Sequence, residues 1–469
     1  MKFCTTWLRL SISAYVLLHF ITYFYDENET LLLLLSISGG LIVAFSSVTL
    51  TIRYFKLPFT LVLTGIIILI LSSEVTFKGI LAGFLQMRNM IGLLVVVPMI
   101  GWVLREKPYM ESMMSLAQNL LNTSRKFYLG IISFTQMIAY FLLFGSIPMM
   151  YQVINMILED KKSEAWENFK GTALLRGFAL STMWVISIPS FAFVVETMDA
   201  SLWISILQGA SMSMVGIVIA VIFSSLEEKK YGVDLTAGLR EEIEKVILHT
   251  NNNEQRNRLV IEFVILFITL FGTIFTLHAM LSMELLVLIP LVVLAWIVTY
   301  YLLNKRPKKL AEEAKTYVIH DLDKQSYQLS MMLGAGMLIY ALHQTPFASF
   351  VVDGIYSLQA NVPFLNILYF LPLMVIVLGF FGLGPLTVMV LLGGILQAIE
   401  LPYPPELIVL TITLGSAISI LLSPLIMPVI VLSGVNGLNG FKNGLQFNWK
   451  YACTLYIVGQ LYVQGRILL

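Results

Sequence analysis

The chain has 469 residues, of which 58% are apolar and only 12% are charged, and its formal net charge is +1. A soluble domain needs more polar residues than this to cover its surface, so the composition excludes a soluble globular protein and indicates one that crosses a membrane repeatedly. The balanced charge excludes nucleic acid as an expected partner, and two cysteines in apolar segments predict neither a disulfide framework nor a metal site.

The apolar residues gather in segments of the length that a membrane-spanning helix needs. About eleven such segments follow one another, which predicts an all-α polytopic membrane protein in the cell membrane. The first lacks a small-x-small cleavage site after it, so we expect an uncleaved span and not a signal peptide. The predicted spans are 6–24, 31–52, 58–75, 90–104, 172–196, 202–224, 259–280, 283–303, 329–344, 405–432 and 452–468.

Two further apolar stretches, 127–157 and 363–398, are too long for one simple span. Each is interrupted near its middle by glycine and proline, in the sequences Gly145-Ser146-Ile147-Pro148 and Gly382-Leu383-Gly384-Pro385. Proline removes a backbone donor, and glycine permits a tight turn. We therefore expect each stretch to enter the membrane and return on the same side, as a re-entrant hairpin with these residues at its tip.

Lysine and arginine residues set the expected orientation, because cytoplasmic loops collect them. With both hairpins re-entrant, the N-terminus is cytoplasmic, the C-terminus lies outside, and the outer loops contain no Lys or Arg except Lys78 and Arg88 in the connection 76–89. The predicted inner loops are 53–57, 105–126, 158–170, 225–258, 304–328 and 434–451, and the other outer loops are 25–30, 197–201, 281–284, 345–362 and 399–404.

The second half of the chain weakly repeats the first at an offset of roughly 237 residues. Pro385 corresponds to Pro148, and Leu422-Ser423-Pro424 corresponds to Ser187-Ile188-Pro189-Ser190. Each half has an odd number of crossings, so the second half is expected to be inverted, as in secondary transporters. The predicted units are an N-terminal span and outer loop (1–30), a first inverted repeat (31–224, with hairpin 127–157 and broken span 172–196), a cytoplasmic linker (225–258) and a second inverted repeat (259–469, with hairpin 363–398 and broken span 405–432).

Interrupted helices leave backbone groups unpaired, which is tolerated only where the interruption faces a protein cavity or water. Half-helix N-termini attract anions, and half-helix C-termini offer carbonyls to Na⁺. Hydroxyl side chains gather beside these interruptions, although small residues also serve helix packing in membranes. The candidate substrate- and ion-binding residues are Gly145, Ser146, Pro148, Ser187, Pro189, Ser190, Gly382, Gly384, Pro385, Thr387, Ser416, Ser419, Ser423 and Pro424.

Charged residues within the spans are few. Arg176 starts a predicted span, and we expect it to be an anchor that snorkels to the inner surface; the alternative is a gate or a counter-charge for an anion. The sequence contains no Gly-x-x-x-x-Gly-Lys-Ser/Thr, His-Glu-x-x-His or Gly-x-Ser-x-Gly motif. We therefore expect neither ATP hydrolysis nor another enzymatic activity, and no cofactor other than Na⁺ or H⁺ as a coupling ion.

This architecture of spans, two interrupted hairpins and two broken spans resembles the ion transporter superfamily, which includes divalent anion/sodium symporters and citrate carriers. The resemblance implies that the tips Gly145–Pro148 and Gly382–Pro385, with the interruptions Ser187–Ser190 and Leu422–Pro424, form the substrate and sodium sites. It also implies elevator-like movement in a homodimer. The tips carry Ser-Ile-Pro and Leu-Gly-Pro where the symporters have Ser-Asn-Thr.

The sequence therefore predicts an ion-coupled secondary transporter of a small anionic organic solute, working by alternating access. One alternative is a cation/proton antiporter on the same scaffold. Another is a membrane protein that does not transport, such as an assembly partner or a lipid-processing protein.

Overall fold

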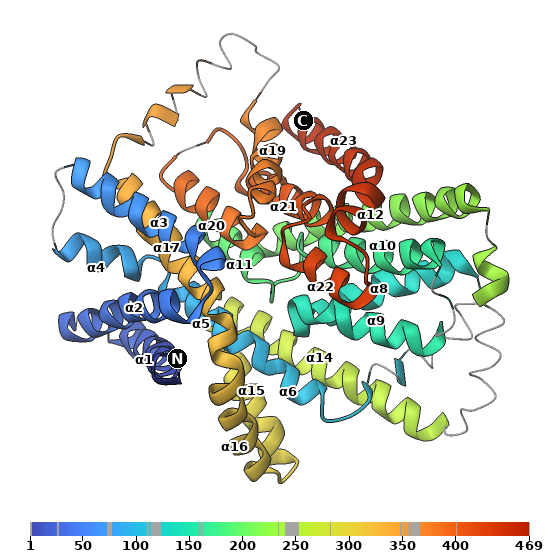
Figure 1. Cartoon of the computed structure of the whole chain (residues 1–469), viewed down its shortest axis with the longest axis horizontal. Helices are drawn as coiled ribbons and strands as arrows, with labels where there is room; N and C mark the ends of the chain where they lie inside the picture. Colours follow the sequence, from blue (N-terminus) through green and yellow to red (C-terminus); the bar gives the residue numbers. More distant parts are fainter. Residues whose placement is uncertain are drawn as a thin grey trace.

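The computed structural model is helical throughout the part of the chain that it describes (Figure 1). The described residues are 2–25, 28–72, 77–109, 112–113, 123–158, 161, 163–232, 234–239, 253–281, 283–347, 349–351, 353–354, 357, 366–399 and 401–468. Within them, eight helical segments are long and apolar enough to cross a membrane. The prediction of a multi-pass, all-helical membrane protein is thereby confirmed.

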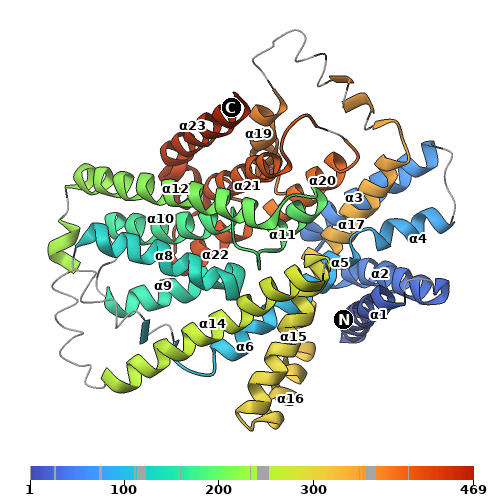
Figure 2. The same cartoon turned by 180° about the vertical axis from the view of Figure 1, so that it is seen from behind.

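Most helices of the N-terminal half begin and end close to the predicted spans. The predicted outer loop 76–89 is an exception, because residues 77–85 form a helix and the next helix already begins at Arg88. The first four helices of this half gather with α17 on one side of the molecule, away from α8–α10 (Figures 1 and 2). The helices are α1 (Lys2–Phe24), α2 (Glu29–Thr49), α3 (Ile52–Leu71), α4 (Phe77–Leu85), α5 (Arg88–Val96), α6 (Ile100–Leu104), α8 (Ser124–Leu142), α9 (Ser146–Ile157), α10 (Glu164–Ser181), α11 (Pro189–Thr197) and α12 (Leu202–Tyr231).

The C-terminal half begins with two long helices that follow the linker. Its last helices pack on α10 and α12, so the two halves of the chain share one core. The helices are α14 (Asn253–Leu281), α15 (Leu285–Leu303), α16 (Pro307–Thr316), α17 (Ser326–His343), α19 (Ile367–Phe380), α20 (Pro385–Leu396), α21 (Pro405–Leu422), α22 (Met427–Asn436) and α23 (Phe447–Leu468).

Four helix interruptions fall at the predicted Gly/Pro sequences. A 3₁₀ turn at Leu143–Gly145 separates α8 from α9, and residues 381–384 separate α19 from α20. In both pairs the two helices contact each other. The predicted broken spans are likewise divided, into α10 and α11 and into α21 and α22. Proline stands at the first or second residue of α11, α20 and α22, where its missing N–H is not needed.

Ion pairs join the helix ends that the charge pattern places on the inner side. Glu106 accepts from both Arg306 and Lys309, at 3.1 and 2.7 Å. Its carboxylate is almost fully buried, whereas the two cations are largely exposed. The other ion pairs between distant segments at these ends are Arg9–Asp323, Lys107–Glu262 and Glu164–Lys442. Each joins two segments that the sequence predicts to lie on the same side.

Polar contacts at the opposite helix ends involve the predicted outer segments. Asn89 donates to Glu284 at 2.6 Å, and the Ser201 N–H donates to Glu406 at 3.1 Å. The Leu286 N–H donates to Glu196 at 3.1 Å. These contacts therefore join segments of the same predicted side as well.

Candidate functional site

A small cavity of about 30 Å³ lies where the interrupted helices meet. Its volume suits one or two water molecules or a dehydrated ion. The lining residues come from the turn at the end of α8 just before the first predicted tip, from the second predicted tip, from both broken spans and from the start of α17. They are Leu143, Phe144, Phe178, Thr182, Ile188, Pro189, Ser190, Gln328, Pro385, Leu386, Ser416 and Ile420.

Two helix N-termini reach this cavity. The helices α11 and α20 begin at Pro189 and Pro385, both of which line it. Neither N-cap residue, Ile188 or Gly384, provides a side-chain hydrogen bond to the helix. The first residue of each helix is proline, which has no N–H, and the Phe191 N–H donates to the Ile188 carbonyl at 3.0 Å. Each helix end therefore contributes mainly its partial positive charge. The cavity lining contains no charged side chain, so its electrostatic character is set by these helix ends.

The polar side chains of the cavity are hydroxyls and one amide. Ser416 is completely buried, and its hydroxyl has no hydrogen-bond partner among the described residues. Ser190 is also buried, whereas Thr182 donates to the Ala179 carbonyl at 2.7 Å. Gln328 of α17 adds the amide. A buried hydroxyl without a partner is costly, so the Ser416 hydroxyl is free to bind a species in the cavity. Ser330 and Ser419 are buried and unpartnered among the described residues as well, but lie outside the cavity lining.

The interruptions of the two broken spans are held by the same kind of hydrogen bond. Ser187 donates to the Tyr140 carbonyl on α8 at 2.5 Å. Ser423 donates to the Gly379 carbonyl on α19 at 2.9 Å. In each half, a serine at the interruption therefore binds the first helix of the preceding hairpin sequence.

Glycines at matching positions allow two further close contacts in each half. Gly177 of α10 packs on α8, and Gly415 of α21 packs on α19; a Cβ atom added to either would lie 3.0 or 2.6 Å from its nearest neighbour. Gly209 of α12 lies against the Met183 carbonyl, and Gly444 lies against the Leu422 carbonyl. The contacts around the two interruptions thus correspond pair by pair.

The structure brings together four of the predicted site residues, Pro189, Ser190, Pro385 and Ser416, in the cavity lining. Ser146 donates to the Leu143 carbonyl within the first tip, and Gly382 has a φ of 86°, which a residue with a side chain rarely adopts. The predicted residues that do not line the cavity are Gly145, Ser146, Pro148, Ser187, Gly382, Gly384, Thr387, Ser419, Ser423 and Pro424.

Eight of the twelve lining residues were not among the predicted site residues, and two of them, Leu143 and Gln328, show why. Leu143 has a φ of 48°, a strained conformation for a leucine that turns the chain after α8. No glycine or proline marks this position, so no sequence signal identifies it. Gln328 precedes the predicted span 329–344 and reaches the cavity only because α17 packs beside α20.

Arg176 does not snorkel, because its side chain is completely buried. The guanidinium donates to Glu227 at 3.1 Å, to the Tyr128 hydroxyl at 2.9 Å and to Asn448 at 3.0 Å. It also lies over the Tyr451 ring, 4.6 Å from its centroid. This residue therefore ties α10 to α8, α12 and α23, and lies outside the cavity lining.

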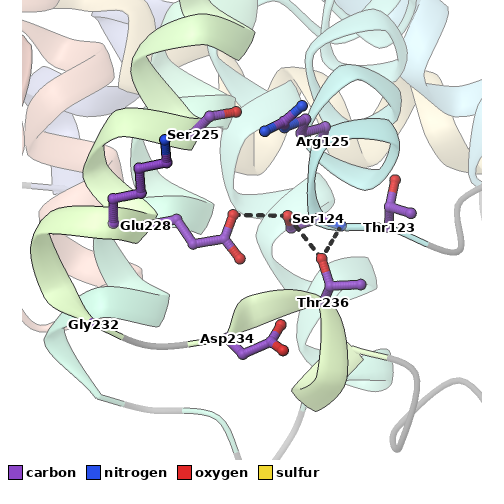
Figure 3. Close-up of a pocket in the computed structure, with 9 residues that line it drawn as sticks. Thr123, Ser124, Arg125, Ser225, Glu228, Gly232, Asp234 and Thr236 are labelled. Carbon is purple, nitrogen blue, oxygen red and sulfur yellow. Dashed lines mark hydrogen bonds between the residues drawn. The ribbon is translucent and has the colours of Figure 1, made fainter.

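A larger pocket of about 640 Å³ lies between the start of α8 and the end of α12 (Figure 3). Ser124 donates to Glu228 at 2.9 Å, and Thr236 donates to Ser124 at 3.1 Å. The Ser124 N–H is itself capped by Thr236. The walls are polar, and the helix start already has its partners, so this pocket joins two predicted inner segments and adds no anion site at the helix end.

Within the described part of the chain, no group of three or more His, Cys, Asp or Glu residues is arranged to hold a metal ion. No known family model matches this chain, and none of the curated proteins is significantly similar to it.

Proposed function

We propose that this protein is an ion-coupled secondary transporter of a small anionic organic solute, and that the cavity between the interrupted helices is its binding site. The proposal rests on which segments of the chain supply the lining residues of the cavity. Pro189 and Ser190 come from one broken span, Ser416 from the other, and Pro385 from the second hairpin tip. Interrupted membrane helices that converge on one cavity are the usual construction of a transporter site.

The charge of the cavity supports an anionic solute. The N-termini of α11 and α20 place their partial positive charge beside it, while the lining has no carboxylate. An anion would gain hydrogen bonds there without displacing an acidic side chain. Ser190, Ser416 and Gln328 could add side-chain donors to the same anion.

The matched contacts support two inverted repeats with re-entrant hairpins. Ser187 and Ser423 make equivalent hydrogen bonds, and the second part of each broken span packs on the hairpin of the other half: α11 contacts α20, and α22 contacts α9. We propose that the hairpins move with the broken spans as one body, in an elevator-like homodimer resembling the ion transporter superfamily. The polar contacts between helix ends support the predicted grouping of segments by side, and the Lys and Arg residues of the inner group support a cytoplasmic N-terminus and an outer C-terminus.

A second candidate is a cation/proton antiporter on the same scaffold. The size of the cavity favours it, because about 30 Å³ accommodates a small dehydrated ion and not an organic molecule. In the first proposal, the same volume represents a closed state that must open to admit the solute. The two candidates differ in the species that crosses the membrane, so a flux measurement separates them.

The test is transport by the purified full-length chain in proteoliposomes. We expect uptake of radiolabelled di- or tricarboxylates to follow an imposed Na⁺ or H⁺ gradient. Ser416→Ala should lower this uptake at least about tenfold, which corresponds to about 1.4 kcal/mol. Ser330→Ala is the matched control, because Ser330 is also completely buried and without a partner among the described residues, but lies outside the cavity lining.

Exchange of Na⁺ for H⁺ without carboxylate uptake would support the antiporter instead. If neither organic acids nor ions cross the membrane under any gradient, the transporter proposal is contradicted. If Ser416→Ala and Ser330→Ala lose uptake equally, the cavity is not the binding site.

A further inference from the structure

A further pocket of about 350 Å³, separate from the two described above, lies between α10, the end of α12 and the start of α23. It has two kinds of wall. Phe223 and Leu226 of α12 form an apolar part, whereas Lys230 and Lys450 provide positive charge. Leu226 is 54% exposed, so the apolar wall continues onto the outer surface of the helix. On a membrane-spanning helix this surface faces lipid chains.

The acidic residues of this pocket are already neutralised. Glu227 accepts from Arg176 at 3.1 Å, and Glu164 pairs with Lys442 at 2.8 Å. Lys230 and Lys450, by contrast, make no ion pair with any described residue. The pocket therefore offers two positive charges to a ligand without competition from its own carboxylates.

The ammonium group of each lysine lies close to an aromatic ring. The Lys230 ammonium lies 5.7 Å from the centroid of the Tyr231 ring, and the Lys450 ammonium lies 5.5 Å from the Trp449 ring. Tyr231 and Trp449 also line the pocket, and Trp449 is 50% exposed. Tyrosine and tryptophan beside lysine, at the end of a membrane helix, are typical of the lipid headgroup level.

We propose that this pocket binds the headgroup of an anionic phospholipid. Lys230 and Lys450 hold the phosphate, Tyr231 and Trp449 flank the glycerol region, and an acyl chain follows Phe223 and Leu226 along α12. A soluble phosphate would use only the lysines, whereas a lipid uses both walls of the pocket. Basic pockets between membrane helices on the cytoplasmic side suit such headgroups.

The neighbouring pocket of Figure 3 supplies a control within the same helix. Lys229 lines that pocket, which is polar and has no aromatic or aliphatic side chain in its wall. Lys229 and Lys230 are adjacent, carry the same charge and are both exposed. Only Lys230 has the apolar and aromatic neighbours that the proposal requires.

The experiment is native mass spectrometry of the full chain in detergent, titrated with phosphatidylglycerol, phosphatidylcholine, glycerol phosphate or inorganic phosphate. We expect one phosphatidylglycerol to bind with higher affinity than phosphatidylcholine, and the double variant Lys230→Ala/Lys450→Ala to weaken its binding at least fivefold. Lys229→Ala should stay within twofold of the wild type, and Lys230→Arg/Lys450→Arg should retain binding because it keeps both charges.

Any one of the following results would overturn the proposal. Phosphatidylcholine could bind as well as phosphatidylglycerol, Lys229→Ala could weaken binding as much as the double variant, or inorganic phosphate could displace the lipid at equal concentration. Competition by glycerol phosphate on the wild-type chain needs no variant. Weak competition supports a site that requires the acyl chain, and full competition excludes it. This site is independent of transport, so its failure leaves the proposed function untouched.

Discussion

The two interruptions of the broken spans are built alike but lie in different surroundings. Ser187 and Ser423 each donate to a carbonyl of the preceding hairpin helix. Around the first interruption, residues 182–188 are almost completely enclosed by other helices. At the second, Leu425 is 57% exposed and Met427, which begins α22, is 50% exposed.

The two interruptions therefore contribute differently to the cavity, although their serines make the same kind of hydrogen bond. The start of α11 lines the cavity, whereas the start of α22 does not. Instead of α22, the start of α20 lines the cavity, and it follows the second predicted tip. The proposed site therefore uses one interruption and one tip with their helix N-termini, and a substitution at corresponding positions of the two halves should have unequal effects.

The largest difference between substitutions at the two interruptions is expected in transport activity. Ser190→Leu places an aliphatic side chain into a cavity that is smaller than the side chain itself, so uptake should fall at least about 100-fold. At the start of α22, Met427 lies outside the cavity lining, and Met427→Leu should stay within about twofold of the wild type. Uptake into proteoliposomes measures both. Equal loss in the two variants would contradict the difference between the interruptions.

A second difference between the two halves is expected in the free energy of unfolding. A Cβ atom at Gly209 would lie 1.9 Å from the Met183 carbonyl oxygen, whereas one at Gly444 would lie 3.1 Å from the Leu422 oxygen. Gly209→Ala should therefore lower the free energy of unfolding by about 3 kcal/mol, and Gly444→Ala by less than about 1 kcal/mol. SDS-induced unfolding in mixed micelles gives both values, and a larger loss for Gly444→Ala would reverse the comparison.

Replacing the serine at each interruption should, by contrast, lower the stability by similar amounts, because the two serines make the same kind of hydrogen bond. Ser187→Ala and Ser423→Ala each remove one hydrogen bond between an interruption and the helix before it, so each should cost about 1 kcal/mol. The same unfolding titration measures this loss. A cost at one serine only would show that the two bonds are not equivalent, and would weaken the case for a repeat.

The smallest effect concerns Glu106, which precedes the first predicted hairpin sequence and contacts Tyr301, Arg306 and Lys309 of the second half. Burial tends to raise the pKa of this carboxyl, but bonds from Lys309 and Tyr301 outweigh burial and lower the pKa overall. Its contribution to stability is thus complete above the unfolded-state pKa of about 4.3 and is lost as the pH falls through the lower folded-state pKa. Glu106→Gln should reduce the acid-induced loss of stability below that pH, and an unchanged pH profile would exclude this role.

The sequence predicts features that rest on local chemistry. The membrane-crossing composition and the four interruptions follow from apolar length and from Gly/Pro positions such as Pro189 and Pro385, and the structure contains them. Four cavity residues were predicted for the same reason, because a helix that starts inside a membrane needs a cavity to face.

Features that depend on packing between distant segments could not be predicted. Gln328 becomes a lining residue only through the position of α17, and Leu143 adopts a strained turn that other contacts impose. Arg176 was expected to snorkel because its position in the sequence is near a helix start. Its burial depends on Glu227, Tyr128 and Asn448, which lie far away along the chain.

The central claim is that the segment from α8 to α9 returns to the side of the membrane from which it entered. Single cysteines at Arg125 and Ser163, two exposed residues at its ends, can be introduced after Cys4 and Cys453 are replaced by serine. A membrane-impermeant maleimide applied to each side of sealed vesicles then reports their location. The account predicts that both cysteines react only from the cytoplasmic side; reaction from opposite sides would contradict the re-entrant hairpin and the repeat built on it.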